Sequence, residues 1–418
     1  MFICVFSRTH NILNNLIGCD FLENYVKIDR DKCIGCNACI RVCPTLDANV
    51  AHLADDGIHS IIDIDPDKCI GCGECVKKCI HQARYYVDNT DEFFSALANG
   101  ENITVLVAPA FRLTEPNADA MLAALRKMGV KAIHDVSFGA DICTYMHIKA
   151  IREGKVKKVV SQPCAALTEY ILKYKHDMVD TVLSPVHSPI SCGAVYLRKY
   201  AGVTGAIAVL SPCIAKKYEF EATGLVQYNV TYKRFVEFMQ KHGSIDVNAT
   251  FTFDGIPAYC GAIYPKPGGL KECLQNAMPT LAVQNAEGVE HVYDELDHYM
   301  YTPTNDRPDV FDVLSCAHGC ISGPGTNFVE SNLITYMTTA GKTGAVAFKA
   351  RRGQTGIFKK RDKQFAWFEK NLRFEDFVRQ YTVIDAHIKE VTAMQIKQAY
   401  EVLGKTTYED QHFDCHAC

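Results

Sequence analysis

Eight cysteines near the start of the chain stand in two copies of one short motif. The first copy, CIGCNACIRVCP, has the spacing C-x2-C-x2-C-x3-C-P, and the second, CIGCGECVKKCI, repeats it with Ile80 in place of the proline. Three closely spaced thiolates on a curled loop can reach three corners of one [4Fe-4S] cubane, while the fourth, on the helix that follows, points to the other cubane. The spacing therefore predicts two crossed ligand sets, namely Cys33, Cys36, Cys39 and Cys79 for one cluster, and Cys69, Cys72, Cys75 and Cys43 for the other.

Zinc is the alternative occupant of such cysteines. Zinc motifs rarely contain three cysteines in this form, twice, with a crossed fourth ligand, so the iron–sulfur interpretation is preferred. Gly35 and Gly71 lie inside the two motifs, where a residue without a side chain lets the backbone pass close to a sulfide. Two adjacent cubanes form an electron relay, and a relay implies a further redox site at its end.

Further cysteines follow short apolar runs in the larger, C-terminal part of the chain. Cys164 follows VVSQP, Cys213 follows VLSP and Cys316 follows VLS, and Cys320 lies four residues after Cys316. Binding sites in parallel α/β sheets form at the carboxyl ends of strands, so we expect these thiols to converge. Four thiolates are the ligand set of a third [4Fe-4S] cluster. The alternative is a set of buried structural cysteines, which are common.

Three segments around these cysteines resemble the signature segments of the [FeFe] hydrogenase family. SQPCAAL stands where T-S-C-C-P belongs, SPCIAKKYE matches P-C-x-x-K-x-x-E, and SCAHGCISGPG matches the C-x3-C segment with its glycine-rich loop. APAFR at 108–112 and FGAD at 138–141 also match. The resemblance extends from residue 25 to about residue 400, and its first signature is degraded.

This resemblance implies an H-cluster, which is a cubane joined through one thiolate to a diiron unit with CO, cyanide and dithiolate ligands. The cubane ligands by motif are Cys164, Cys213, Cys316 and Cys320. Cys320 would be the bridge to the diiron unit. Lys216 would donate a charge-assisted hydrogen bond to a cyanide, Glu219 would pair with a neighbouring lysine, and Pro109 would line the dithiolate pocket.

The chain departs from the family where protons are expected to move. The family's efficient members place a cysteine directly before the first cubane ligand, where this chain has Pro163, which carries no exchangeable proton. His147 and Ala150 occupy the positions of two relay glutamates, and Ser184 occupies that of a relay serine. Such losses resemble the sensory branch of the family, whose members turn over hydrogen slowly.

Two smaller features belong to the same comparison. Cys143 and His147 lie four residues apart on an expected helix, so they share a face and would offer a substitute proton path. The alternative is a core cysteine and a surface histidine. Two methionines that pack near the diiron unit in the family correspond here to Ser211 and Leu314.

The elements that must position these residues alternate between strands and helices from about Asp91 onward. The strand candidates are ITVLVAP, KAIHDV, KVKKVVS, AIAVLS, DVFDVLS and AVAFKA. The helix candidates are AMLAALRKM, ICTYMHIKAIREG, ALTEYILKYK, YKRFVEFMQKHG and AMQIKQAYEVLG. We therefore expect an α/β body with two lobes of mostly parallel twisted sheet flanked by helices. An N-terminal α+β ferredoxin-like domain would hold the two clusters, each half with a short strand, a cysteine loop and a short helix.

The chain is divided by these patterns into four parts. They are an unassigned segment at 1–24, a two-[4Fe-4S] ferredoxin domain at 25–88, an H-cluster domain at 91–405 and a tail at 406–418. The tail ends in Cys415-His-Ala-Cys418, which is interpreted as a truncated iron–sulfur motif or a dithiol pair. The cysteines without a motif are taken as structural thiols, namely Cys4, Cys19, Cys192, Cys260 and Cys273.

Composition excludes several classes of function. The 418 residues include 44 Lys and Arg against 48 Asp and Glu, a net charge of −4 that gives no reason to expect a nucleic-acid partner. No apolar run reaches the roughly 18 residues of a membrane span, and no export signal is recognised. With 20 cysteines, most of them in short motifs rather than in a disulfide framework, we expect an anaerobic, reducing cytoplasm.

The favoured interpretation is a hydrogen or redox sensor of low turnover. Such an oxidoreductase would bind H2, split it slowly and reversibly, and pass electrons through the two ferredoxin-type clusters. Its partners would be H2 and protons, ferredoxin or another redox or signalling protein, and the proteins that mature the H-cluster. Two alternatives stay open: a competent ferredoxin-linked hydrogenase with a non-standard proton path, and an iron–sulfur scaffold or electron-transfer protein that lacks the diiron unit.

Overall fold

A computed structural model of the chain describes residues 25–45, 47–54, 57–58, 60–348, 357–387, 392–402, 404–405 and 407–408, the side chains of 343–348 and 357–360 excepted. The part up to Ile384 is one compact unit, and the part from Asp385 onward is a second, which contains helix α17 (Ala393–Val402). Cys4, Cys19, Cys415 and Cys418 lie outside the described residues, so the expectations about them stay predictions, as do the domain limits.

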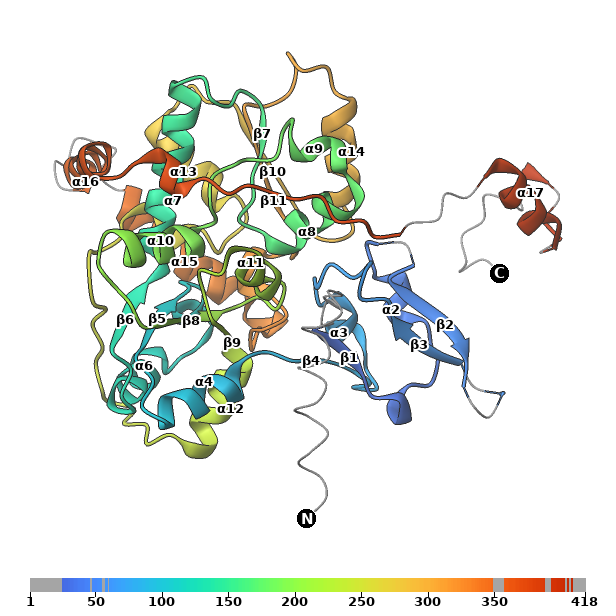
Figure 1. Cartoon of the computed structure of the whole chain (residues 1–418), viewed down its shortest axis with the longest axis horizontal. Coiled ribbons are helices and arrows are strands. Elements are labelled where there is room, and N and C mark those ends of the chain that lie inside the picture. The colour runs from blue at the N-terminus through green and yellow to red at the C-terminus, as the bar shows by residue number, and fades with distance from the viewer. Residues whose placement is uncertain are drawn as a thin grey trace, which may run out of the picture. The chain divides into compact units, whose positions relative to one another are not determined.

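The head, residues 25–88, is built from two similar halves (Figure 1). Its elements are β1 (Val26–Ile28), the 3-10 helix η1 (Arg30–Lys32), α2 (Ala38–Arg41), β2 (Asn49–Leu53), β3 (Ser60–Ile64), α3 (Glu74–Lys78) and β4 (Arg84–Tyr86). Strands β1 and β4 pair antiparallel, and β2 and β3 form an antiparallel pair of their own. In each half a strand, a cysteine loop and a short helix follow one another, so the predicted α+β head is confirmed.

The first sheet of the body contains four parallel strands in the order β6-β5-β8-β9 (Figure 1). These strands are β5 (Ile103–Val107), β6 (Ala132–Asp135), β8 (Ala206–Ser211) and β9 (Tyr228–Thr231). All five residues of β5 are buried, which is typical of a parallel strand covered on both faces. The covering helices include α4 (Thr90–Ala98), α5 (Phe111–Thr114), α6 (Ala118–Lys127) and α12 (Tyr232–His242).

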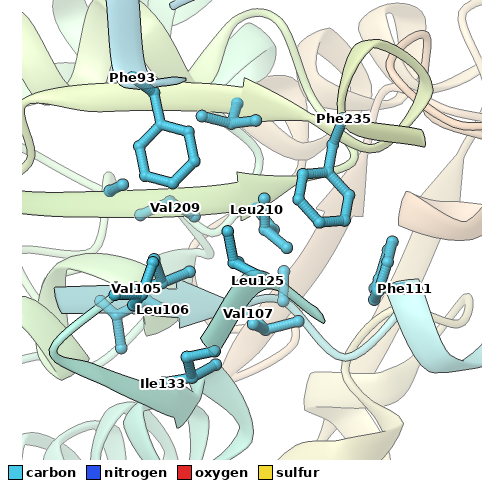
Figure 2. Close-up of a cluster of buried hydrophobic side chains, with 14 of the residues drawn as sticks. Phe93, Val105, Leu106, Val107, Phe111, Leu125, Ile133, Val209, Leu210 and Phe235 are labelled. Carbon is cyan, nitrogen blue, oxygen red and sulfur yellow. The ribbon is translucent and has the colours of Figure 1, made fainter. Parts of the chain in front are cut away.

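A continuous apolar core holds this sheet to its helices. Figure 2 shows Phe93 of α4, Leu125 of α6 and Phe235 of α12 turned toward the side chains of β5 and β8. Val105 and Val209 on these strands are fully buried in the same cluster. Burial of side chains of this size contributes about 1.5–3 kcal/mol each relative to exposure, so this core is a main source of the lobe's stability.

The second sheet has three parallel strands in the order β10-β11-β7. They are β7 (Val159–Val160), β10 (Val283–Glu287) and β11 (Val310–Leu314). Successive residues of β11 alternate between two cores, because Phe311 and Val313 pack with the cluster of α8 (Ala165–Tyr174) and α14 (Val292–Tyr301), whereas Val310 packs with the cluster of α7 (Val136–Arg152) and α13 (Gly269–Ala277). The predicted body of two parallel sheets flanked by helices is therefore confirmed.

The remaining elements connect or cover these two sheets. They are α9 (His176–Val179), α10 (Pro189–Lys199), α11 (Lys216–Thr223), η2 (Cys260–Ile263), η3 (Gly319–Ser322), η4 (Glu330–Asn332), α15 (Leu333–Phe348), α16 (Ile357–Asn371) and η6 (Phe374–Phe377). Among the described helices, none combines the length and the apolar composition that a membrane crossing requires.

In the body, one predicted strand is wrong, and two of the observed strands were not predicted. AVAFKA was expected to be a strand, but residues 345–348 of it end helix α15. Short apolar runs carry too little periodicity to separate a strand from the end of a helix. Strands β9, with the sequence YNVT, and β10, with VQNAE, contain too many polar residues to stand out, although each pairs in parallel with a strongly apolar neighbour.

The head packs directly against the body. Lys173 of α8 donates through Nζ to the Cys69 carbonyl at 2.8 Å, and the Tyr174 hydroxyl donates to the Lys68 carbonyl at 2.8 Å. Gly71 has φ +66°, and a Cβ at that position would come within 2.6 Å of the Tyr218 ring. The second cysteine loop therefore needs glycine both for its left-handed turn and for its close approach to α11.

A glycine also permits the closest contact between helices α7 and α10. A Cβ at Gly139 would lie 2.2 Å from the Pro189 carbonyl oxygen, so we expect Gly139→Ala to destabilise the protein by about 1–3 kcal/mol through overpacking. Gly341→Ala in α15 is the matched control, since nothing lies within 4 Å of its added Cβ. Urea unfolding measures both variants, and equal stability of the two would contradict this account of the helix contact.

Candidate functional site

The first predicted ligand set of the head surrounds one small cavity. Its four cysteines, drawn from both motifs, line this cavity together: Cys33, Cys36, Cys39 and Cys79. Arg84 and His81 are the charged or titratable side chains that line it beside the cysteines. The crossed fourth cysteine thus lies where the motif spacing places it, while ligation itself stays a prediction.

The cysteines of the second predicted ligand set also lie close to one another. The charges of Cys43, Cys69 and Cys75 all act on Cys72, and Cys43 acts on Cys69 and Cys75 as well. Burial raises the pKa of Cys69 to about 11 and raises those of Cys72 and Cys75 further. Thiols in this setting are protonated at neutral pH unless a positively charged centre binds them, which fits a cluster site.

The four body cysteines meet at one cavity although they come from distant segments. Cys164 lies between β7 and α8, Cys213 follows β8, Cys316 follows β11, and Cys320 lies in η3. All four line the same cavity, together with Lys216 and Pro109. Strands of both sheets thus deliver thiols to it from their carboxyl ends.

The thiols of this cavity are buried and act on one another. Burial, with the charge of Cys164 as a smaller cause, raises the pKa of Cys213 to about 11 and that of Cys320 to about 12. The Lys216 ammonium opposes this by lowering both pKa values. Lys216 is therefore a cation that faces the cluster of thiols in this cavity.

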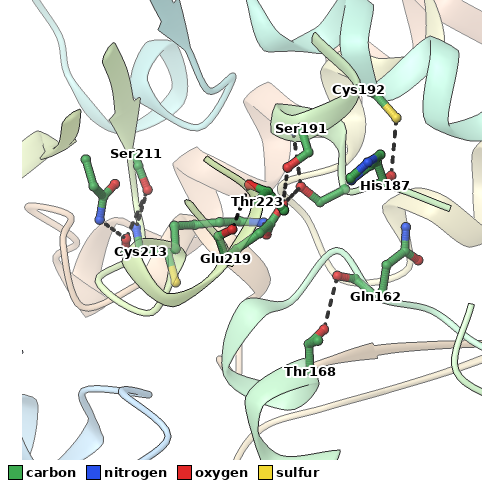
Figure 3. A network of polar contacts seen from close by, with 12 residues as sticks. Gln162, Thr168, His187, Ser191, Cys192, Ser211, Cys213, Glu219 and Thr223 are labelled. Atoms are coloured by element: carbon green, nitrogen blue, oxygen red, sulfur yellow. Dashed lines mark hydrogen bonds and ion pairs between the residues drawn. The ribbon is translucent and has the colours of Figure 1, made fainter. Parts of the chain in front are cut away.

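Lys216 is held by a buried polar network on helix α11. Its ammonium pairs with the Glu219 carboxylate, and the hydroxyls of Ser188 and Ser191 donate to the other oxygen of that carboxylate (Figure 3). Burial opposes ionisation of Glu219, but the charges of Lys216 and Arg379 and the hydrogen bonds lower its pKa to about 2. The expected pairing of Glu219 with a lysine is thus present, with Lys216 itself as the partner.

The wall of the cavity is mostly apolar. Five prolines take part in it, namely Pro109, Pro163, Pro189, Pro212 and Pro265. Proline has no backbone N–H, so this wall offers few donors and repels water. Leu314 lines the cavity at one of the two positions compared with methionines, whereas the Ser211 hydroxyl donates to the Cys213 carbonyl at 3.0 Å and does not line it.

The body cavity and the cavity of the first head set differ in the volume that is open to the centre of a water molecule. It is about 90 Å³ in the body cavity and about 20 Å³ in the cavity of the first head set. The body cavity is therefore the larger of the two. Its donor set of four thiols and one ammonium fits an anionic iron–sulfur group with anionic ligands.

The described residues contain no place for a single metal ion. No three Cys, His, Asp or Glu side chains among them stand close enough together to hold one. Tetrahedral zinc, with Zn–S of about 2.3 Å, needs thiols about 3.8 Å apart. A cubane binds each thiolate through a different iron and so spreads the thiolates farther apart.

Helix α7 carries a buried hydrogen-bonded chain at the relay positions. His147 is fully buried, so the alternative of a surface histidine is wrong. Its Nδ1 donates to the Cys143 carbonyl at 2.9 Å and lies 3.7 Å from Cys143 Sγ, while Nε2 lies 2.8 Å from the Ser184 hydroxyl. The turn between α9 and α10 supplies Ser184, and Ala150 adds no polar group.

Cys143 and His147 change each other's protonation. Burial alone would raise the pKa of the Cys143 thiol, but hydrogen bonding with Cys192 and the charge of His147 lower it. Burial alone would lower the pKa of His147, but the Cys143 thiolate raises it. Each of the two side chains therefore shifts the pKa of the other toward its charged form.

Two residues at the cavity were not recognised from the sequence. Asp312 lies inside the apolar strand β11 and lines the cavity, and burial raises its pKa to about 6. Tyr264 also lines the cavity, and its hydroxyl contacts both Thr144, at 2.7 Å, and the Cys143 thiol. A single charged residue within the run VFDVL was the available signal for Asp312.

The other cysteines of the body are core residues. Cys192, Cys260 and Cys273 are buried, as expected of structural thiols. The Cys192 thiol donates to the His187 carbonyl at 3.2 Å, and the Cys273 thiol to the Cys260 carbonyl at 3.3 Å. Every described cysteine is free of a disulfide.

One lysine side chain lies between the head and the body cavity. Lys77 of α3 donates to the Ser322 carbonyl at 3.3 Å. Burial alone would lower its pKa, but the charges of Cys316, Glu74 and Cys72 raise it. One lysine thus faces both a cysteine of the second head set and a cysteine of the body cavity, which places the two groups close together.

Family models match two parts of the chain. A model described as "4Fe-4S dicluster domain" matches residues 25–80, and one described as "Iron only hydrogenase large subunit, C-terminal domain" matches residues 101–295. The second match ends before Cys316 and Cys320, so the grouping of these two cysteines with the others rests on the structure.

Individual relatives agree with these models. The periplasmic [Fe] hydrogenase large subunit of Nitratidesulfovibrio vulgaris (strain Hildenborough) is 29% identical over 255 residues, which cover 53% of this chain and 59% of that protein. A variant of the [FeFe]-hydrogenase HydA1 from Chlamydomonas reinhardtii aligns with a TM-score of 0.52 at 14% identity over 72% of this chain and 100% of its own. The structure HydA(deltaEFG), titled for stepwise H-cluster assembly, aligns with a TM-score of 0.51 at 15% identity, over 71% of this chain and 99% of its own. These structural matches show the fold.

The buried pair on α11 predicts a large cost when one partner is removed. Glu219→Gln leaves the Lys216 ammonium without its counter-charge, so we expect a loss of about 3–5 kcal/mol in the free energy of unfolding at pH 7. Because the folded-state pKa of Glu219 is depressed from 4.5 to about 2, this contribution is present above pH 4.5 and is lost as the pH falls toward 2. Urea unfolding of the metal-free chain across this pH range measures it.

The matched control for this experiment is Glu221→Gln, an exposed carboxylate on the same helix. We expect it to change stability by less than about 0.5 kcal/mol. Lys216→Met combined with Glu219→Gln should recover most of the loss, since it removes both charges. Equal destabilisation by the Glu219 and Glu221 variants would contradict the importance of the buried pair.

Proposed function

Since family models for a 4Fe-4S dicluster domain and for the C-terminal domain of the iron-only hydrogenase large subunit match this chain, we propose that it binds H2 and splits it slowly and reversibly at an H-cluster. Electrons pass between that site and two [4Fe-4S] clusters in the head. The protein acts as a sensor, and its occupancy by hydrogen or its redox state is read by a partner protein.

The observation that carries this proposal is the convergence of four thiols and one lysine on a single apolar cavity. Three thiols arrive from strand ends of two different sheets and Cys320 from a short helix, and Lys216 faces them. Structural cysteines have no reason to gather around a cavity lined by prolines. The donor set and the larger volume of this cavity support an H-cluster more than a cubane alone.

The proposed ligands are the cysteines grouped in the head and the cysteines that line the body cavity. The head sets are Cys33, Cys36, Cys39 and Cys79, and Cys43, Cys69, Cys72 and Cys75. The body set is Cys164, Cys213, Cys316 and Cys320, with Cys320 as the bridging thiolate. When bound, the H-cluster supplies the iron centre that holds H2 and accepts its electrons.

The residues of this chain orient and isolate that group. Lys216 carries three N–H donors, of which Glu219 takes one, so donors remain for an anionic ligand such as cyanide. Glu219 and the two serines hold the lysine in one position. Pro109 and the other prolines keep water out of the cavity, which strengthens the interaction of Lys216 with an anion.

Slow turnover follows from the residues around Cys164. Pro163 replaces a proton-carrying group, and Ala150 leaves a second relay position without one. Removal of one positioned acid–base group typically lowers a rate by about 10²–10⁴. A sensor tolerates this loss, because the fraction of sites occupied matters more to it than the flux.

We place the protein in an anaerobic cytoplasm, with ferredoxin or another redox or signalling protein and the H-cluster maturation proteins as partners. The described cysteines are all free, which supports a reducing compartment. The curated relative is named as periplasmic, so cell fractionation of the native protein is the direct test of the compartment.

Infrared spectroscopy of anaerobically matured protein, with and without H2, tests the proposed site. We expect bands of metal-bound CO and cyanide that shift under H2 and that are absent from Cys320→Ala. Lys216→Met should keep the CO bands but shift the cyanide bands, since it removes the charged donor. A fully iron-loaded protein without such bands would leave the scaffold or electron-transfer alternative, which has a cubane but no diiron unit.

One observation favours the second candidate, a competent hydrogenase with a non-standard proton path. Tyr264 lines the cavity and contacts Cys143, which lies beside His147, whose Nε2 reaches the Ser184 hydroxyl. Leu183 and Pro185, the neighbours of Ser184, line a separate cavity of about 720 Å³ at the protein surface. A hydrogen-bonded chain thus extends from the buried cavity toward the surface.

Protons can move along this hydrogen-bonded path by transfer from one side chain to the next. When Ser184 passes its proton to His147 Nε2 and takes a replacement on its outer side, Nδ1 can pass its own proton to Cys143 Sγ, once that sulfur has released its proton toward the cavity. The same steps reversed carry a proton outward. A carbonyl oxygen can only accept, so the neutral ring keeps its proton on Nδ1, which suits this direction of transfer.

Removal of the imidazole separates the two candidates. If the path operates, His147→Gln should slow hydrogen–deuterium exchange by about 10²–10⁴ while leaving the infrared bands in place. His298→Gln, at an exposed histidine, is the matched control and should leave exchange unchanged. An unaltered exchange rate in His147→Gln would exclude the path and favour the sensor.

A further inference from the structure

Arg84 is a buried cation in the head. It lies on β4, and only 4% of the residue is exposed. Within the described part of the chain, no carboxylate lies within ion-pair distance of its guanidinium, in contrast to the exposed Arg30, which pairs with Asp63. A buried charge without a counter-charge costs several kcal/mol, so its position requires a compensating anion.

The contacts of Arg84 point toward the cysteines. Nη2 donates to the Ile62 carbonyl and to the Cys39 thiol, the latter at 3.4 Å. Nη1 is buried and has no hydrogen-bond partner among the described residues. The guanidinium also lines the cavity of the first ligand set. One end of this side chain is thus in direct contact with a predicted cluster ligand.

The same guanidinium acts on the second ligand set. Its positive charge favours the thiolate forms of both Cys69 and Cys75. Cys39 of the first set and Cys75 of the second pack in one buried cluster with Ile62, whose carbonyl accepts from Arg84, so the two sets lie next to each other beside this side chain. Arg84 therefore faces both sets, and no other arginine of the described head does so.

Cluster chemistry supplies the missing anion. A cubane with four thiolates has a net charge of about −2 when oxidised and about −3 when reduced. A positive charge beside it stabilises the reduced form, and an N–H···S hydrogen bond does the same. The effect is strong inside the protein, because the local dielectric constant is far below that of water.

We propose that Arg84 is the shared counter-charge of the two head clusters and raises the reduction potentials of both. Because one charge faces both clusters, it raises the two potentials together and limits the energy step for an electron that passes between them. The proposal rests on the proposed ligation of the head and not on the hydrogen chemistry of the body.

A redox titration followed by electron paramagnetic resonance tests this proposal on the full chain, reconstituted with iron and sulfide but not matured with a diiron unit. In Arg84→Gln we expect both midpoint potentials to fall, with iron content unchanged. The expected size is about a tenfold change in the ratio of oxidised to reduced cluster at a fixed solution potential, which is about 59 mV for one electron. Arg84→Lys should retain most of the wild-type potentials, since it keeps the charge.

Arg41→Gln is the matched control, because Arg41 is an exposed arginine on α2 beside the same cysteine loop. Water screens its charge, so we expect its removal to leave both potentials in place. Unshifted potentials in Arg84→Gln would overturn the proposal. A shift of only one cluster would overturn its shared character, and an equal shift in Arg84→Lys would show that shape rather than charge matters.

Arg84→His keeps the proposal testable if the glutamine variant does not bind iron. We expect the potentials of both clusters in Arg84→His to fall as the pH rises through the titration of the imidazole, while the wild-type potentials do not follow it. Potentials of Arg84→His that match the wild type's pH dependence would overturn the proposal. Failure of the ligation itself is recognised separately, because the wild-type chain would then lack the signals of two cubanes.

Discussion

Parallel strands all end at the same edge of their sheet, and this constraint places the chemistry of the molecule. Strand β8 of the first sheet and strands β7 and β11 of the second each end a few residues before a cysteine, and these cysteines line one cavity. The helix that follows each strand leaves the edge free for a site. Without two parallel sheets facing the same cavity, thiols separated by some 150 residues of chain would have no reason to meet.

Burial of charge is the second principle of this structure. Each buried cation described here lies beside an anion or beside thiols that would become anionic in a cluster. Lys216 has Glu219 on one side and the thiols of the cavity on the other, and Lys173 pairs with Glu169 at 3.3 Å. Arg84 is the exception to pairing with a carboxylate within the described head, since cysteine thiols and a backbone carbonyl face it. The exception is informative because a buried charge must be compensated by something.

Helix α7 connects the core to the site. Its glycine allows close packing on α10, and its next turns carry Cys143 and His147 on one face toward Ser184 and Tyr264. Pro163 removes a proton carrier at the cavity itself, but the helix supplies two titratable groups one layer behind it. The balance between sensing and turnover therefore depends on whether protons cross this layer.

The sequence by itself was enough for the features that depend on local spacing. The two cysteine motifs predicted both ligand sets, and the structure groups the same residues; the alternation of apolar and helical runs predicted the parallel α/β body. Spacing was informative there because a loop or a strand end positions its side chains through its own geometry. It failed for AVAFKA, where a short apolar run fits a strand and a helix equally well.

Only the tertiary structure decided the features that depend on contacts between distant segments. The burial of His147 and its reach to Ser184 depend on how α10 packs against α7. Asp312 and Tyr264 face the cavity, and Arg84 lies between the two ligand sets, because separate elements pack around them. Apart from the single charge within the run VFDVL, no local pattern marks such residues, since burial and electrostatic environment are properties of the packed chain and not of any one segment.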